Sequence, residues 1–301
     1  MPMLNLLVLF LFLLLGFALQ GPKFLPRNTH LFFNLVILRI CLPAAILLSV
    51  PSITWSGKLV SLVPAAWIIF GTAYYFFNFY GQKCGWDKKV IGCLILTAGL
   101  GNTSFIGFPV IIAMLGNEAF SYAVVFDQMG TFLICSTLGI WLVNSYSSYH
   151  LSRSMLIKRI IQFPPFLAFT AALILSFYEW EATGDVRWWL EFLVLLLGPL
   201  AFMSVGLQLK IQDIRSEWKY LKWGLGFKLI LAPTMIYFLY LILGVPREIF
   251  AVSLLESAMA PMITASILAA SYGLHPRLAS LMVGLGVPVS FLSLSLWYLL
   301  L

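Results

Sequence analysis

The stretch GLGNTSFIGFPV, residues 99–110, places polar and helix-weakening residues inside a long apolar segment. Asn102, Thr103 and Ser104 carry hydrogen-bonding side chains, and Pro109 follows a glycine a few residues later. Proline removes a backbone donor and clashes with the preceding turn, so it weakens a helix. Polar groups that are freed in hydrocarbon must be satisfied by protein or by a wet cavity. We therefore predict that a helix is interrupted here and that the interruption lines a ligand site.

A second stretch of the same kind, residues 254–273, contains Pro261 followed by Met262. If the chain consists of two related halves, this stretch corresponds to the first one. Two half-helices that begin at one point concentrate partial positive charge there, which suits an anion. We therefore expect an anion to bind between Asn102, Thr103 and the backbone around Pro261.

Four further polar or charged residues lie inside apolar segments, namely Asp127, Gln128, Lys228 and Glu256. Charges within a membrane are costly and usually face the protein interior or water. Asp127 is the first candidate for a functional acid, because it can accept a proton, pair with Lys228, or brace the interrupted helix through Gln128. Coupling to protons or to sodium and a purely structural role both remain open for these residues. No cluster with the spacing of metal ligands occurs.

The elements that hold these residues must be membrane helices. The chain has 301 residues, of which 61% are hydrophobic and 10% are charged. Soluble domains have about 45–50% apolar and about 25% charged residues. A membrane helix needs roughly 20 apolar residues. We expect an all-α membrane protein with ten helices, at about 4–20, 31–51, 59–80, 90–115, 119–144, 160–178, 189–208, 218–243, 248–272 and 277–300.

The chain divides into two halves of five helices. We place the first repeat at 1–145, a cytoplasmic linker at 146–159 and the second repeat at 160–301. Because five is odd, the second half enters the membrane from the opposite side and forms an inverted repeat. In the second helix of the first half, Pro43 and Ala44 are expected to complete the anion pocket.

The distribution of basic residues predicts the orientation in the membrane. Most Lys and Arg residues lie in the loops after the odd-numbered helices, whereas the other loops hold only Lys58, Arg187 and Arg247. Basic residues mark cytoplasmic loops. Both termini are therefore expected on the outer side of the membrane.

Several classes of function find no support in the sequence. The basic residues are scattered and form no face for nucleic acid, and no Walker loop, G-x-S-x-G or H-E-x-x-H motif occurs. The four cysteines form no C-x-x-C pair. We expect no enzyme and no cofactor. A channel and a membrane sensor without transport remain as alternatives to a carrier.

Four segments resemble the auxin efflux carrier family, which includes the PIN-FORMED-like and bacterial carriers. They are GNTSFIGFPV (101–110), FDQMGTFLICSTLGIW (126–141), PLAFMSVGLQL (199–209) and the segment 256–297. The resemblance implies that helices 4 and 9 are broken and cross at the substrate site, as in sodium-coupled bile-acid carriers. It implies a scaffold of helices 1, 2, 6 and 7, and a transport domain of helices 3–5 and 8–10.

The same resemblance implies a homodimer and elevator-type transport of small organic anions. Relatives export the auxin anion or are linked to malate and malonate. Ala260 stands where bacterial relatives often have a second proline, and no Asn lies near the second crossover, which argues against an auxin-like ligand. The substrate, the direction of transport, and the choice between uniport, proton coupling and sodium coupling stay open.

Overall fold

The computed structural model describes residues 2–20, 25–26, 28–53, 57–147, 162–209 and 214–301. These residues form helices and contain no strand. From residue 148 onward, the predicted linker 146–159 lies outside them. Six helices of this part are long and apolar enough to cross a membrane: Thr29–Ser49, Leu59–Lys83, Asn117–Tyr146, Gly184–Gln208, Trp218–Leu243 and Pro276–Tyr298. The expected all-helical membrane protein is confirmed at this level.

The chain splits into two compact units, and each unit combines segments from both halves of the sequence. Unit 1 comprises Met1–Ser56, Ser104–Val124 and Arg159–Leu209. Unit 2 comprises Gly57–Thr103, Val125–Lys158 and Lys210–Leu301. The two units are described separately below.

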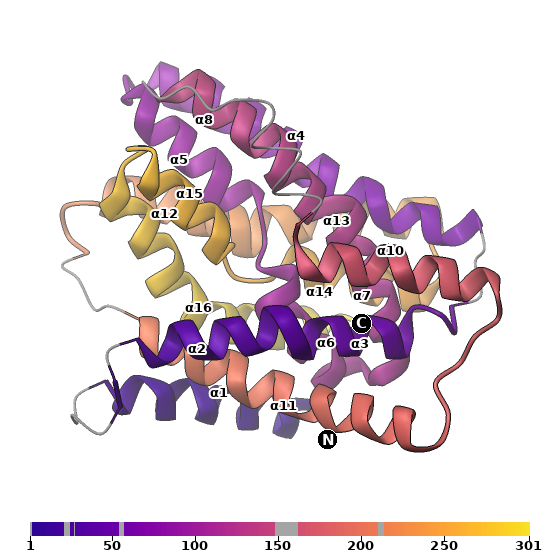
Figure 1. Cartoon of the computed structure of the whole chain (residues 1–301). Coiled ribbons are helices and arrows are strands. Elements are labelled where there is room, and N and C mark those ends of the chain that lie inside the picture. The colour runs from indigo at the N-terminus through magenta and orange to yellow at the C-terminus, as the bar shows by residue number, and fades with distance from the viewer. Residues whose placement is uncertain (1, 21–24, 27, 54–56, 148–161, 210–213) are drawn as a thin grey trace. The chain divides into compact units, whose positions relative to one another are not determined.

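Unit 1 is built around α1 and α11, which lie side by side (Figure 1). Gly16 on α1 and Gly206 on α11 let the two backbones approach closely, as small residues do between membrane helices. The side chain of Gln20 donates to the carbonyl oxygen of Gly206 at 2.7 Å. The helical elements of this unit are α1 (Pro2–Ala18), α2 (Thr29–Val36), η1 (Ile37–Cys41), α3 (Leu42–Ser49), α6 (Phe108–Leu115), η4 (Asn117–Ala119), α10 (Pro164–Phe177) and α11 (Gly184–Gln208).

Unit 2 surrounds a central helix, α5 (Lys88–Gly99), whose residues are buried from Val90 to its end. Asp87 caps this helix by accepting from the backbone N–H of Lys89 at 2.6 Å. A helix that is apolar on all sides belongs inside a protein, and α4, α8, α12, α15 and α16 pack around it (Figure 1). The elements here are η2 (Gly57–Ser61), α4 (Leu62–Lys83), α5, η5 (Asp127–Phe132), η6 (Cys135–Gly139), α8 (Ile140–Tyr146), α12 (Trp218–Gly226), η7 (Phe227–Leu231), α13 (Ala232–Leu243), α14 (Arg247–Ser257), α15 (Ile263–Ser271) and α16 (Pro276–Tyr298).

Two helices bridge the division of the chain into units. The first begins with η3 (Thr103–Gly107) and continues as α6, and the second contains η4, α7 (Phe120–Phe126) and η5. Their residues are assigned to the two units as given above.

Three prolines follow a widened, π-helical turn instead of breaking their helix. Pro43 follows η1, Pro109 follows η3 and Pro233 follows η7, each after one intervening residue. A proline clashes with the carbonyl group four residues earlier, and a π turn inserts an extra residue that relieves such a clash. Pro109 therefore lies within the continuous helix Thr103–Leu115, and the interruption predicted beside it occurs several residues earlier, before Thr103.

Candidate functional site

Two interruptions between helices lie against each other, at residues 100–102 and 258–262, which all belong to unit 2. α5 ends at Gly99 and the next helix begins at Thr103, while α14 ends at Ser257 and α15 begins at Ile263. Between them, Gly101 and Pro261 form an isolated antiparallel bridge. The prediction that the chain is broken at Pro261 is confirmed.

Backbone hydrogen bonds join the two interruptions. The N–H of Asn102 donates to the carbonyl oxygen of Ala260 at 2.8 Å, and the N–H of Met262 donates to that of Leu100 at 3.0 Å. Non-helical backbone at membrane depth must be satisfied within the protein. Each interruption therefore supplies the partners that the other has lost.

The side chain of Asn102 has an unsatisfied donor at this point. It is only 3% exposed, and its Nδ2 has no hydrogen-bond partner among the described residues. An unsatisfied buried donor costs about 1–3 kcal/mol. A bound acceptor would remove this cost, so Asn102 is the first candidate for a ligand contact.

Two helices begin beside Asn102. One is Thr103–Leu115, and the other is α15, which starts after Met262 and has no side-chain cap. The first turn of a helix has unpaired N–H groups and partial positive charge. These ends favour an acceptor that carries negative charge.

A buried charge cluster lies in the same unit. Asp127, Gln128, Lys228 and Glu256 are each at most 1% exposed. The carboxylate of Asp127 accepts from the hydroxyl of Thr103 on one oxygen and from Nε2 of Gln128 at 2.6 Å on the other. Asp127 therefore contacts the helix that begins at Thr103 directly, which the sequence did not predict, whereas the sequence suggested that Asp127 braces this helix through Gln128.

Lys228 lies where α5 and α14 end. Its ammonium donates to the carbonyl oxygen of Ser257, the last residue of α14, at 2.8 Å. A Cβ atom on Gly101 would lie 2.9 Å from Nζ of Lys228. Cations are favoured at helix C-termini, so Lys228 bonds to a helix end, whereas the sequence suggested a pairing with Asp127.

Glu256 lies on α14 near the interruption and is 0% exposed. Neither of its carboxylate oxygens has a hydrogen-bond partner among the described residues. Together with Thr103 and Lys228 it lines a cavity of about 10 Å³.

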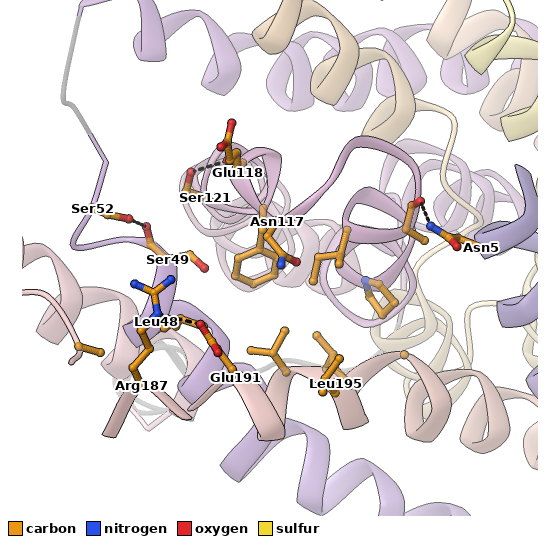
Figure 2. A pocket seen from close by; sticks show the side chains of 18 of the residues that line it. Asn5, Leu48, Ser49, Ser52, Asn117, Glu118, Ser121, Arg187, Glu191 and Leu195 are labelled. Atoms are coloured by element: carbon orange, nitrogen blue, oxygen red, sulfur yellow. Dashed lines mark hydrogen bonds and ion pairs between the residues drawn. The ribbon is translucent and has the colours of Figure 1, made fainter. Parts of the chain in front are cut away.

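A larger cavity of about 840 Å³ lies in unit 1 (Figure 2). Its charged lining includes Arg187, which is ion-paired with Glu191 at 2.8 Å, and two further acids, Glu118 and Glu181. An anion would compete with Glu191 for the guanidinium and meet an excess of negative charge. Size alone would select this cavity, but its charge argues against an anion there.

Four residues of the predicted site belong to unit 1. Pro43 and Ala44 lie on α3, Ser104 lies in η3, and Pro109 lies on α6, where it lines the larger cavity. The paired interruptions are formed without them, by residues of unit 2.

Comparison with known proteins agrees with the helical architecture. A family model described as "Membrane transport protein" matches residues 2–298. This match defines the chain as a multi-pass membrane transporter by class. The chain belongs to this family, which is the auxin efflux carrier family that the sequence motifs resemble.

Two curated relatives align with nearly the whole chain. An "Uncharacterized transporter" from Methanothermobacter thermautotrophicus is 28% identical over 290 residues, covering 94% of this chain and 93% of the relative. The "Uncharacterized transporter MJ1031" from Methanocaldococcus jannaschii is 25% identical over 311 residues, covering 98% and 97%. Both names agree with transport and give no substrate.

Proposed function

We propose that this protein is a secondary carrier of small organic anions, and that the anion binds at the paired interruptions of unit 2. The carboxylate accepts from the side chain of Asn102 and from N–H groups in the first turn of α15, which has no side-chain cap. The observation that carries this proposal is the buried, unsatisfied Nδ2 of Asn102 at the paired interruptions, where α15 begins without a side-chain cap.

The finer architecture belongs to the same proposal. We propose ten membrane helices in two inverted five-helix repeats, elevator-type alternating access and a homodimer. The protein lies in a bacterial cytoplasmic membrane with both termini outside. Support comes from the odd number of helices that the sequence predicts for each half, the distribution of basic residues and the family resemblance.

Transport is tested by counterflow in proteoliposomes. Vesicles loaded with unlabelled malate, malonate, acetate or phenylacetate are diluted into the same labelled acid, and transient accumulation of label is measured. A carrier exchanges unlabelled acid from inside the vesicles for labelled acid from outside, so the label becomes transiently more concentrated inside than outside. Passive ohmic current without counterflow would indicate a channel, and inactivity with every acid would refute an organic anion carrier.

The site is tested by Asn102→Ala. We expect affinity for the exchanged acid to fall about tenfold to a hundredfold, because one hydrogen bond to a charged group is worth about 1.5–3 kcal/mol. Asn117→Ala, in the larger cavity, is the matched control and should behave like the wild type. Unchanged affinity in the Asn102 variant would place the anion elsewhere.

A further inference from the structure

Glu256 combines complete burial with a lack of hydrogen-bond partners. Its two oxygens are unsatisfied among the described residues, and it lines the cavity of about 10 Å³ with Thr103 and Lys228. A cavity of about 10–15 Å³ holds roughly one water molecule. One water can therefore deliver a proton to Glu256, but the space is too small for a hydrated ion.

Two charges act on Glu256, those of Asp127 on η5 and Lys228 on η7. The other helices packed on α14 are α4, α13 and α16. They carry no charged residue except Lys83 and Arg277, which lie in terminal turns. The balance at Glu256 is thus set by one acid and one base.

Among the described residues, Asp127 and Lys228 both have hydrogen-bond partners for their side chains, unlike Glu256. Asp127 accepts from Thr103 and Gln128, and bonds of this kind favour a carboxylate. Lys228 donates to the terminal carbonyl group of α14. The cluster holds two acids and one base, so ionising both Asp127 and Glu256 would leave at least one uncompensated negative charge in a buried site, which is strongly unfavourable.

We propose that Glu256 is the proton site of this carrier and that it binds one proton together with each organic anion. This inference rests on the proposed function. The carboxyl O–H bond forms with a proton delivered from one aqueous side through the cavity water, and it breaks when the proton is released to the other side. No other reactant takes part.

The position of Glu256 explains the coupling to the anion. A Cβ atom on Gly101 would lie 3.3 Å from the carbonyl oxygen of Glu256, so this residue packs against the paired interruption beside Asn102. An ionised Glu256 repels a carboxylate there, and a protonated one does not. Coupling between two ligands is reciprocal, so the anion also favours protonation.

Sodium fits this place poorly. A bare cation needs several oxygen ligands in place of its water, and the ammonium of Lys228 already lines the small cavity. The ammonium of Lys228 thus lies at the ends of α5 and α14. Other transporters with discontinuous membrane helices bind a coupling ion at such helix ends.

The protonation of Glu256 is tested in the absence of any substrate. Infrared difference spectra of the purified protein in lipid, recorded in H₂O and D₂O across a pH titration, should show the C=O band of a protonated carboxyl group at neutral pH. The band should disappear in Glu256→Gln and persist in Glu248→Gln, an exposed acid on the same helix. A wild type without this band, or a Glu256→Gln variant that retains it, would overturn the proposal.

The coupling is tested with labelled malate at pH values at which malate is fully ionised. The apparent affinity of the wild type should fall at least about fivefold as the pH rises, as expected for coupled sites. Glu256→Gln should bind with the same affinity at every pH and lose acceleration by a proton gradient, while Glu248→Gln follows the wild type. Uptake driven by sodium, or pH dependence that survives in Glu256→Gln, contradicts the proposal.

The two proposals fail separately. Counterflow of malate that is independent of pH would refute the proton site and leave the carrier intact. A protonated Glu256 in a protein that exchanges no carboxylate would refute the carrier and the coupling, but not the protonation of Glu256.

Discussion

Replacing Gly286 by alanine tests whether Pro261 is held in place by the pairing of the two interruptions. Gly286 lies on α16, and a Cβ atom there would lie 2.6 Å from Cδ and 2.9 Å from Cγ of Pro261, whereas ordinary contact begins at 3.4 Å. The proline ring is rigid, and its neighbours Ala260 and Met262 take part in the two backbone bonds of the pairing. Either α16 or the paired segment must move.

The cost of this change follows from the clash. Overpacking a tight interior costs about 1–3 kcal/mol. The matched control is Gly71→Ala on α4, also in unit 2, where a Cβ atom would meet nothing within 4 Å. Alanine is favoured over glycine inside a helix by about 0.5–1 kcal/mol, so the control should be neutral or more stable.

The assay is the apparent melting temperature of each purified variant in one detergent at one scan rate, because unfolding of such proteins is often irreversible. Gly286→Ala should melt several degrees below Gly71→Ala and should show weaker malate counterflow. If Gly286→Ala melts as high as the control and exchanges malate normally, Pro261 is free to move and the pairing does not hold it.

Two more predictions concern the packing of unit 1 and the charge balance of unit 2. Gly206→Ala would drive a Cβ atom into the backbone carbonyl oxygen of Leu13, so α1 should separate from α11 and the yield of folded protein should fall sharply on size-exclusion chromatography; a normal profile would contradict the close approach. Lys228→Met removes the hydrogen bond from the ammonium to the carbonyl oxygen of Ser257 and the one positive charge of the cluster, and should cost about 1.5–3 kcal/mol, seen as a lower melting temperature. Adding Asp127→Asn to that variant should recover much of the loss, and a further decrease would refute the charge balance.

The long apolar runs and the weak point at Pro261 could be predicted from the sequence, because both depend on local composition. The first interruption lies within the predicted stretch 99–110, but its place relative to Pro109 could not be predicted. Pro109 looks like a helix breaker, but the π turn η3 accommodates it, and the chain instead opens before Thr103. The opening occurs there because Leu100 and Asn102 find backbone partners in a segment far away in the sequence.

The members of the charge cluster could also be named in advance, whereas their partners could not. Hydropathy alone marks Asp127, Lys228 and Glu256 as unusual. Asp127 accepts a hydrogen bond from the hydroxyl of Thr103, and Lys228 donates one to the carbonyl group of Ser257. The second bond could not be predicted, because the sequence does not show that α14 ends at Ser257. Because Lys228 bonds to Ser257, it does not bond to Glu256, whose oxygens have no hydrogen-bond partner among the described residues.

The widened turn η7 places a further constraint on evolution of the chain. Lys228 lies within that turn, a fixed number of residues before Pro233. A regular helix turns by about 100° per residue, so losing or gaining one residue between them would rotate the ammonium away from the end of α14 and toward another side of the helix. Between Lys228 and Pro233, substitutions should therefore be tolerated more readily than insertions or deletions.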